Sequence, residues 1–170
     1  MSAPGAIGRF DRSDRSDYEA VTRLLGREPQ GAFTVVVRRC DGSPVVLANE
    51  PLLDSGRPMP TRFWLVDRGL VRAVGRLESL GGVNEAEAMV DPVELQAAHD
   101  AYAAERDALI DAAHVGPRPH GGVGGTRTGV KCLHAHYANY LVGAADPVGR
   151  WVAERLAATG DAYDETEPGQ

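Results

Sequence analysis

The chain has 170 residues, of which 43% are hydrophobic and 25% are charged, so it is long enough to bury the core of one domain. Its formal net charge of −6 argues against a general nucleic-acid-binding protein, because clustered lysine and arginine side chains provide most of the affinity for phosphate backbones. The sequence contains no apolar run of membrane-spanning length, and we expect neither a secretory signal nor membrane binding. Two cysteines, Cys40 and Cys132, are too few for a disulfide framework, which favours a cytoplasmic protein.

Composition divides the chain into three parts. Residues 1–15 mix small, polar and charged side chains without periodicity, which is typical of a flexible N-terminal arm. Residues 16–158 carry the periodic segments of a single domain, and residues 159–170 form an acidic tail that we expect to be flexible. At the start of the domain, Ser16 and Glu19 have the spacing of a capping box and predict the beginning of a first helix.

Three segments rich in β-branched and aromatic residues follow this helix, at residues 32–38, 45–48 and 61–66. Turn-forming residues between Cys40 and Pro44 separate the first two segments. They predict a small three-stranded antiparallel sheet, which requires helices packed against it to be stable.

Helical periodicity dominates the rest of the chain and predicts helices over residues 67–81, 84–90, 91–116, 128–141 and 146–158. Asn84 is the predicted cap of the second of these, and Asp91 followed by proline is a strong start signal for the third. The same periodicity places Leu109 and Ala113 on the buried face of that long helix. The predicted fold class is therefore α+β, a small antiparallel sheet packed against about five or six helices.

A glycine-rich loop precedes the central helix. Residues 118–131 contain Arg118, Arg127 and Lys131 but no acid. Glycines allow backbone angles that turn several N–H groups inward, and a helix beginning near Thr128 would direct its free amides to the same place. This pattern predicts a site for a phosphate or carboxylate, and a merely flexible connection is the alternative interpretation. The predicted ligand-binding residues are Gly124, Gly125, Thr126, Arg127, Thr128, Gly129, Lys131 and Asn139.

The segment Cys132-Leu-His134-Ala-His136 carries the reactive side chains. On a regular helix Cys132 and His136 share a face, and His134 joins them only if the first turn is irregular or extended. In one interpretation Cys132 and His136 are catalytic. Cys132 is the nucleophile, and its thiolate is favoured by the helix N-terminus and by nearby Arg127, Lys131 and His136, whose imidazole Asn139 or Asp146 orients. In a second, Cys132, His134 and His136 bind zinc. The remaining ligand would then come from Cys40, His114 or His120.

Two further interpretations of this segment stay open. The residues could recognise an anion without chemistry, or Cys132 could be a small buried residue beside histidines that are hydrogen-bonded in the core. Elsewhere we expect Arg39 in solvent, or in contact with an anion if its sheet edge faces the loop. We expect His99 at the surface or the core edge. Glu78 is an acid–base candidate that nothing in the sequence places near Cys132.

The central motif resembles a known bacterial family, the domain of unknown function 501 (DUF501). The matching residues are Gly124-Gly-Thr-Arg-Thr-Gly-Val-Lys-Cys-Leu-His-Ala-His-Tyr-Ala138, followed by Asp146-Pro-Val-Gly149. The resemblance implies a soluble cytoplasmic protein, and it implies no established activity, cofactor or catalytic residue. Members of the family are often encoded near an exopolyphosphatase-type enzyme and a small cell-division protein. That association implies a phosphate-related role, or a non-enzymatic adaptor in the cell envelope or division.

From these observations we expect a protein that binds a small phosphate- or carboxylate-bearing ligand at the glycine-rich loop, with Cys132 and His136 beside it. Whether it is an enzyme, with hydrolytic or transfer chemistry, stays open. A zinc site is one alternative function. A non-enzymatic adaptor that binds a protein partner or a second copy of the chain is the other.

Overall fold

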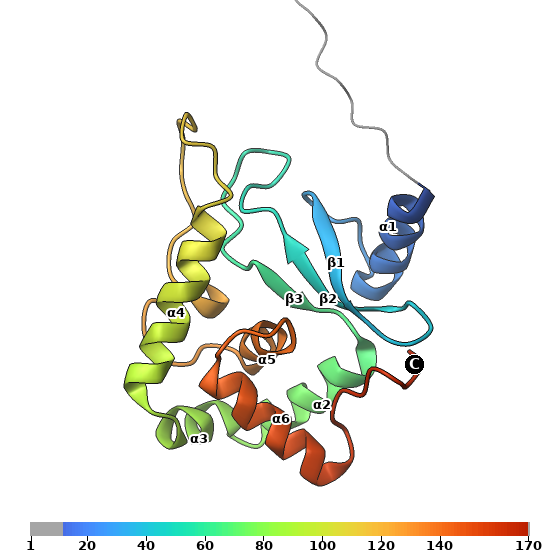
Figure 1. The fold of residues 1–170 in the computed structure, drawn as a ribbon, viewed down its shortest axis with the longest axis vertical. Helices are drawn as coiled ribbons and strands as arrows, with labels where there is room; N and C mark the ends of the chain where they lie inside the picture. Colours follow the sequence, from blue (N-terminus) through green and yellow to red (C-terminus); the bar gives the residue numbers. More distant parts are fainter. Residues whose placement is uncertain (1–11, 170) are drawn as a thin grey trace, which may run out of the picture.

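A central sheet with helices on both of its faces organises the molecule (Figure 1). The computed structural model describes residues 12–169. In chain order the elements are α1 (Arg12–Leu25), β1 (Phe33–Arg38), β2 (Pro44–Asn49), β3 (Phe63–Leu65), α2 (Arg68–Ser79), α3 (Gly82–Met89), α4 (Pro92–Asp107), the 3-10 turn η1 (Val123–Gly125), α5 (Leu133–Leu141) and α6 (Pro147–Thr159). The predicted α+β class is confirmed. None of the helices between residues 12 and 169 has both the length and the apolar composition needed to cross a bilayer.

The sheet has the order β1-β2-β3, with each strand antiparallel to its neighbour. Successive side chains of a strand point to opposite faces. Val46 and Ala48 of β2 join the main core on the side of α5, whereas Leu47 joins a smaller core beneath α1. Because both faces of β2 are covered, all six of its residues are buried.

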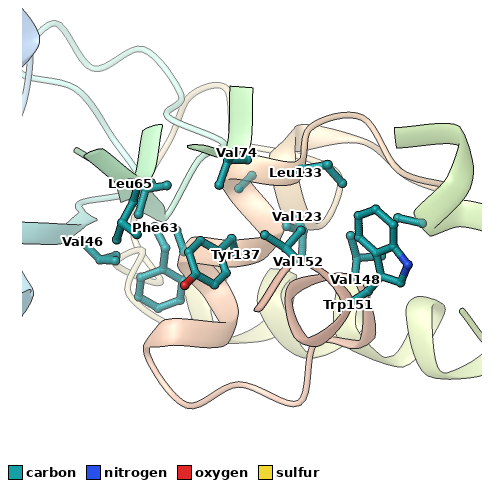
Figure 2. Close-up of a cluster of buried hydrophobic side chains, with 14 of the residues drawn as sticks. Val46, Phe63, Leu65, Val74, Val123, Leu133, Tyr137, Val148, Trp151 and Val152 are labelled. Atoms are coloured by element: carbon teal, nitrogen blue, oxygen red, sulfur yellow. The ribbon is translucent and has the colours of Figure 1, made fainter. Parts of the chain in front are cut away.

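Helix α5 lies at the centre of the main core. It packs against β3, α2 and α6, and its Leu133 and Tyr137 side chains are almost fully buried. Figure 2 shows Phe63 and Leu65 of β3 beside Tyr137 of α5, with the side chains of α6 on the far side of that helix. This packing fixes the N-terminus of α5 against α2, and the reactive segment of the sequence lies at that junction.

Two predicted helix starts before α4 are wrong. Helix α1 begins at Arg12, so Ser16 and Glu19 lie inside it rather than at its N-terminus, and of the expected arm only residues 1–11 lie outside the described residues. Helix α3 begins at Gly82, and its cap is Gly81 with φ 90° rather than Asn84. Both errors arise because a side chain able to cap is also tolerated inside a helix whose apolar face is buried.

The long helix α4 starts where the sequence predicts, with Asp91 accepting the Val93 and Glu94 amides, but it ends at Asp107. Beyond that point the chain forms tight turns, and the Asp111 carboxylate accepts the Ala113 amide in place of a helical carbonyl. Such local side-chain bonds compete with helix formation. Leu109 and Ala113 are consequently exposed, and their predicted burial is wrong.

The acidic segment after α6 makes defined contacts with the sheet. The Tyr163 hydroxyl donates to the Arg38 carbonyl at 2.7 Å, and its ring lies 5.4 Å from the Arg39 guanidinium. Arg39 is only 8% exposed and donates to the Asp67 carboxylate at 3.1 Å, so its predicted place in solvent is wrong. Part of segment 159–170, which the sequence predicts to be a flexible tail, thus lies against this buried ion pair through Tyr163 and Asp164.

Candidate functional site

The glycine-rich loop is a sequence of turns that fits tightly against α4. Gly122 lies so close to this helix that an added Cβ would come 2.5 Å from Cβ of His99, and the position therefore requires glycine. Gly129 has φ 67°, a left-handed angle that favours glycine. Between them η1 forms one short turn, and the Gly122 amide donates to the Thr126 carbonyl. The loop is thus built from tight turns and close contacts with α4.

His99 holds both ends of this loop. Its Nδ1 accepts the Val123 amide at 3.0 Å, and its Nε2 lies 2.9 Å from the Gly129 carbonyl, to which it donates. Burial lowers the pKa of His99 below its ordinary 6.5, which favours the neutral ring that this pair of bonds requires. The side chain is 2% exposed, so the predicted place of His99 at the surface or core edge is wrong.

Helix α5 begins later than the sequence predicts. Its N-cap is Cys132, in an extended conformation with φ −154° and ψ 122°, and Thr128 caps nothing. The Val130 amide donates to the Glu87 carboxylate at 2.9 Å, and the Leu133 amide donates to the Glu78 carboxylate at 2.7 Å. The protein's own acids therefore occupy amides that the sequence assigned to a bound anion.

Cys132, His134 and Glu78 come together at this helix start. The Cys132 Sγ lies 3.7 Å from His134 Nδ1, and a Glu78 carboxylate oxygen lies 3.2 Å from the same nitrogen. Each residue offers one metal-ligating atom, and these atoms all lie within 4.8 Å of one another. The His134 and Glu78 side chains are 25% and 28% exposed, so solvent reaches the cluster.

The backbone explains why His134, and not His136, meets the thiol. A regular helix would put Cys132 and His136 on one face, but Cys132 precedes the helix in an extended conformation. The other ring nitrogen of His134, Nε2, donates to the Val71 carbonyl of α2 at 3.0 Å. This bond fixes the ring with Nδ1 toward Cys132 and Glu78.

The charge state of His134 follows from its surroundings. Burial acts to lower the pKa of its imidazole, but hydrogen bonds to Cys132 and the Val71 carbonyl, together with the Glu78 charge, outweigh burial and raise the pKa to about 9. In the metal-free protein the ring therefore carries a proton at neutral pH. A metal ion would displace the Nδ1 proton and take its place.

His136 and Asn139 belong to a separate buried network. His136 Nδ1 lies 2.9 Å from the Asp146 carboxylate, which also accepts the Asn139 amide nitrogen at 3.0 Å and the Gly149 amide. His136 is fully buried, and its ring lies 5.6 Å from that of His99. Asp146 orients the imidazole, as one sequence interpretation proposed, but the network serves to join α5 to α6.

The remaining predicted site residues lie outside the group of Glu78, Cys132 and His134. Arg127, Thr128 and Lys131 are exposed, while the Thr126 hydroxyl donates to the Thr128 carbonyl. Gly124 and Gly125 belong to η1. Of the residues proposed to complete a metal site, Cys40 and His120 are exposed and His114 is half-buried. Within residues 12–169 the group of Glu78, Cys132 and His134 is the only one of three or more such side chains close enough to hold a metal ion.

Glu78 is the site residue that sequence reasoning missed. It lies 55 residues before Leu133, whose amide it accepts, and the sequence holds no local signal that joins them. A thiol, an imidazole and a carboxylate at a solvent-accessible helix start can bind a metal, or can activate the thiol as a nucleophile.

The protein is thus of the α+β class, with a thiol–imidazole–carboxylate cluster at the start of its central helix α5. The chain belongs to the DUF501 family, since the family model described as "Protein of unknown function (DUF501)" matches residues 36–154. The matched region contains all three residues of the cluster and also His99. No curated protein and no solved structure matches the chain.

Proposed function

We propose that this protein binds a zinc ion through Glu78, Cys132 and His134, and that the ion activates a water molecule for hydrolysis. The observation that carries the proposal is the bond from His134 Nε2 to the Val71 carbonyl at 3.0 Å. Histidine ligands of metals usually donate their second ring nitrogen to a carbonyl or carboxylate, which fixes the tautomer and aims the first nitrogen. Here that first nitrogen is directed at a thiol and a carboxylate.

The donor set favours zinc among common metals. Thiolate sulfur, imidazole nitrogen and carboxylate oxygen are all zinc ligands, whereas calcium and magnesium prefer oxygen alone. Zinc with three protein ligands keeps a fourth position for water, and bound water can lose a proton near neutral pH. The partial exposure of His134 and Glu78 would let a substrate reach that position.

An anion site in the glycine-rich loop has less support than zinc binding. The Val130 and Leu133 amides already donate to Glu87 and Glu78, and a bound anion would meet these two carboxylates. We also propose that the protein acts in the cytoplasm. Both of its cysteines are free, and a reducing compartment keeps Cys132 available as a ligand.

The test is elemental analysis of untagged protein produced with zinc in the medium. We expect one zinc ion per chain in the wild type and in Cys40→Ser, which removes the other, exposed thiol. Cys132→Ser and Glu78→Gln should each lower the zinc content, and X-ray absorption should detect one sulfur ligand at about 2.3 Å. Substoichiometric zinc that Cys132→Ser leaves unchanged would overturn the proposal. Rapid alkylation of Cys132 in such zinc-free protein would point to the thiol nucleophile instead.

A further inference from the structure

We infer that His99 is a positioning residue, which fixes the glycine-rich loop and through it the place of Cys132. The inference rests on the proposed zinc site for its functional meaning. His99 lies on α4, outside the group of Glu78, Cys132 and His134, and its contacts are with the loop and with His136.

A single imidazole joins two points of the loop that are six residues apart. Nδ1 accepts the Val123 amide at 3.0 Å, and Nε2 donates to the Gly129 carbonyl at 2.9 Å. With His99 only 2% exposed, water does not compete for either bond. Only the neutral ring with its proton on Nε2 can form both bonds, because a protonated Nδ1 could not accept the amide.

Neighbouring side chains fix the loop at further points. Arg106, also on α4 and 1% exposed, donates to the Gly121 carbonyl at 2.9 Å and to the Pro60 carbonyl at 3.3 Å. On the other side, Glu87 of α3 accepts the Val130 amide. The bond from His99 to Gly129 is therefore the last anchor from α4 before the reactive segment begins.

Cys132 lies between two fixed points of the backbone. Gly129 and Val130 are held by His99 and Glu87, and the Leu133 amide is held by Glu78. Cys132 itself makes no capping bond from its side chain. Its thiol contacts His134 and packs against the main core, but the backbone that carries it is held by these anchors. Releasing the Gly129 anchor would let the thiol move away from His134 before a metal binds.

Two amide variants, each of which mimics one ring nitrogen, separate the two bonds of His99. His99→Asn keeps an acceptor near the position of Nδ1, and we expect it to protect the Val123 amide from hydrogen exchange while losing the Gly129 anchor. His99→Gln keeps a donor near the position of Nε2, and in this variant the Val123 amide should exchange faster with solvent. Because the anchor that lies toward Cys132 is Gly129, zinc affinity should fall at least about tenfold in His99→Asn and less in His99→Gln.

His114→Asn is the control, since the ring of this half-buried histidine hydrogen-bonds to the nearby Pro117 carbonyl, within its own turn. The variant should leave zinc affinity and Val123 exchange unchanged. Exchange of α6 amides in every variant reports whether the fold is kept. If a His99 variant unfolds, Gly122→Ala takes its place, because the added Cβ would press on His99 at 2.5 Å without removing either hydrogen-bonding group.

Zinc affinity and Val123 exchange that both match the wild type in folded His99→Asn and His99→Gln would overturn the inference. A wild type that binds no zinc would instead overturn the proposed function. In that case the positioning role is judged by Val123 exchange and by the alkylation rate of Cys132, and unchanged values of both in the variants would reject it.

Discussion

His134 is the residue whose charge is most affected by its neighbours. Burial opposes the charged ring, yet the hydrogen bonds to Cys132 and Val71 and the charge of Glu78 raise its pKa to about 9. The raised pKa means that the folded, metal-free protein binds this proton more tightly than the unfolded chain, in which a histidine has a pKa of about 6.5. Proton binding at His134 therefore stabilises the metal-free fold.

The sign of this effect gives a pH prediction. The stabilisation by protonated His134 is complete below about pH 6.5 and is lost as the pH rises through about 9. In urea titrations, the unfolding free energy of the chelator-treated wild type should therefore fall between these two pH values, relative to that of chelator-treated His134→Gln. Glutamine keeps a donor for the Val71 carbonyl but does not titrate. Identical pH dependences of the two proteins would contradict the assigned charge of His134.

The sequence motif identified where the reactive residues lie but paired them incorrectly. Spacing on an ideal helix favoured Cys132 with His136, and the irregular start that pairs Cys132 with His134 was only a conditional alternative. No single-sequence signal could bring in Glu78, because its approach depends on how α2 packs against α5. Tertiary packing decides the membership of this site.

Among the secondary-structure elements, α5 and α6 are joined by one carboxylate. Asp146 caps α6 through the Gly149 amide and also accepts from the buried His136 and Asn139 side chains. Asp91 caps α4 in the same way, through the amides of Val93 and Glu94, but it is exposed and binds no other side chain there. Removal of Asp146 therefore leaves the His136 and Asn139 side chains without an acceptor, whereas removal of Asp91 leaves only backbone amides unpaired.

Replacing each cap by alanine measures this difference. Asp91→Ala should lower the unfolding free energy by about 1 kcal/mol, the usual effect of losing an N-cap. Asp146→Ala also leaves two buried donors without an acceptor, and it should cost at least about 2 kcal/mol more. Guanidinium titrations at one pH would show this, and equal losses in the two variants would mean that the His136 and Asn139 bonds contribute little.

Element boundaries were predictable where the cap is local in sequence. Asp91 with Pro92, and Asp146 with Pro147, marked the starts of α4 and α6 correctly. The start of α5 was missed because the acceptor for its first amide is Glu78 of another helix, so Cys132 is an N-cap without a capping side chain. The end of α4 was missed because the periodicity continued into turns that Asp111 stabilises.

Across the whole molecule, Arg39 connects three segments that are far apart in the chain. It directly follows β1 and donates to Asp67, which caps α2 through the Leu70 amide. It also donates to the Asp164 carbonyl, beneath the ring of Tyr163 in the C-terminal segment. From composition this segment was predicted to be a flexible acidic tail, because charge and polarity do not reveal a single buried partner.

The neighbouring residue Arg38 provides a matched comparison. It also forms an ion pair, with Asp17 of α1, but the two side chains are 40% and 21% exposed, against 7% and 5% for Arg39 and Asp67. Exposed pairs contribute about 1 kcal/mol or less, since solvent screens them. Removing one partner of a buried pair leaves the other charge without compensation and costs about 3–5 kcal/mol.

Arg39→Met should therefore lower the unfolding free energy by about 3–5 kcal/mol, and Arg38→Met by about 1 kcal/mol or less. Hydrogen exchange gives an independent readout, because loss of Arg39 should also release the amide of Tyr163, which donates to the Tyr137 hydroxyl at 3.2 Å. Arg38→Met keeps the Arg38 carbonyl that Tyr163 binds, so protection there should persist. Equal effects of the two variants on stability and exchange would mean that the C-terminal segment does not depend on the buried pair.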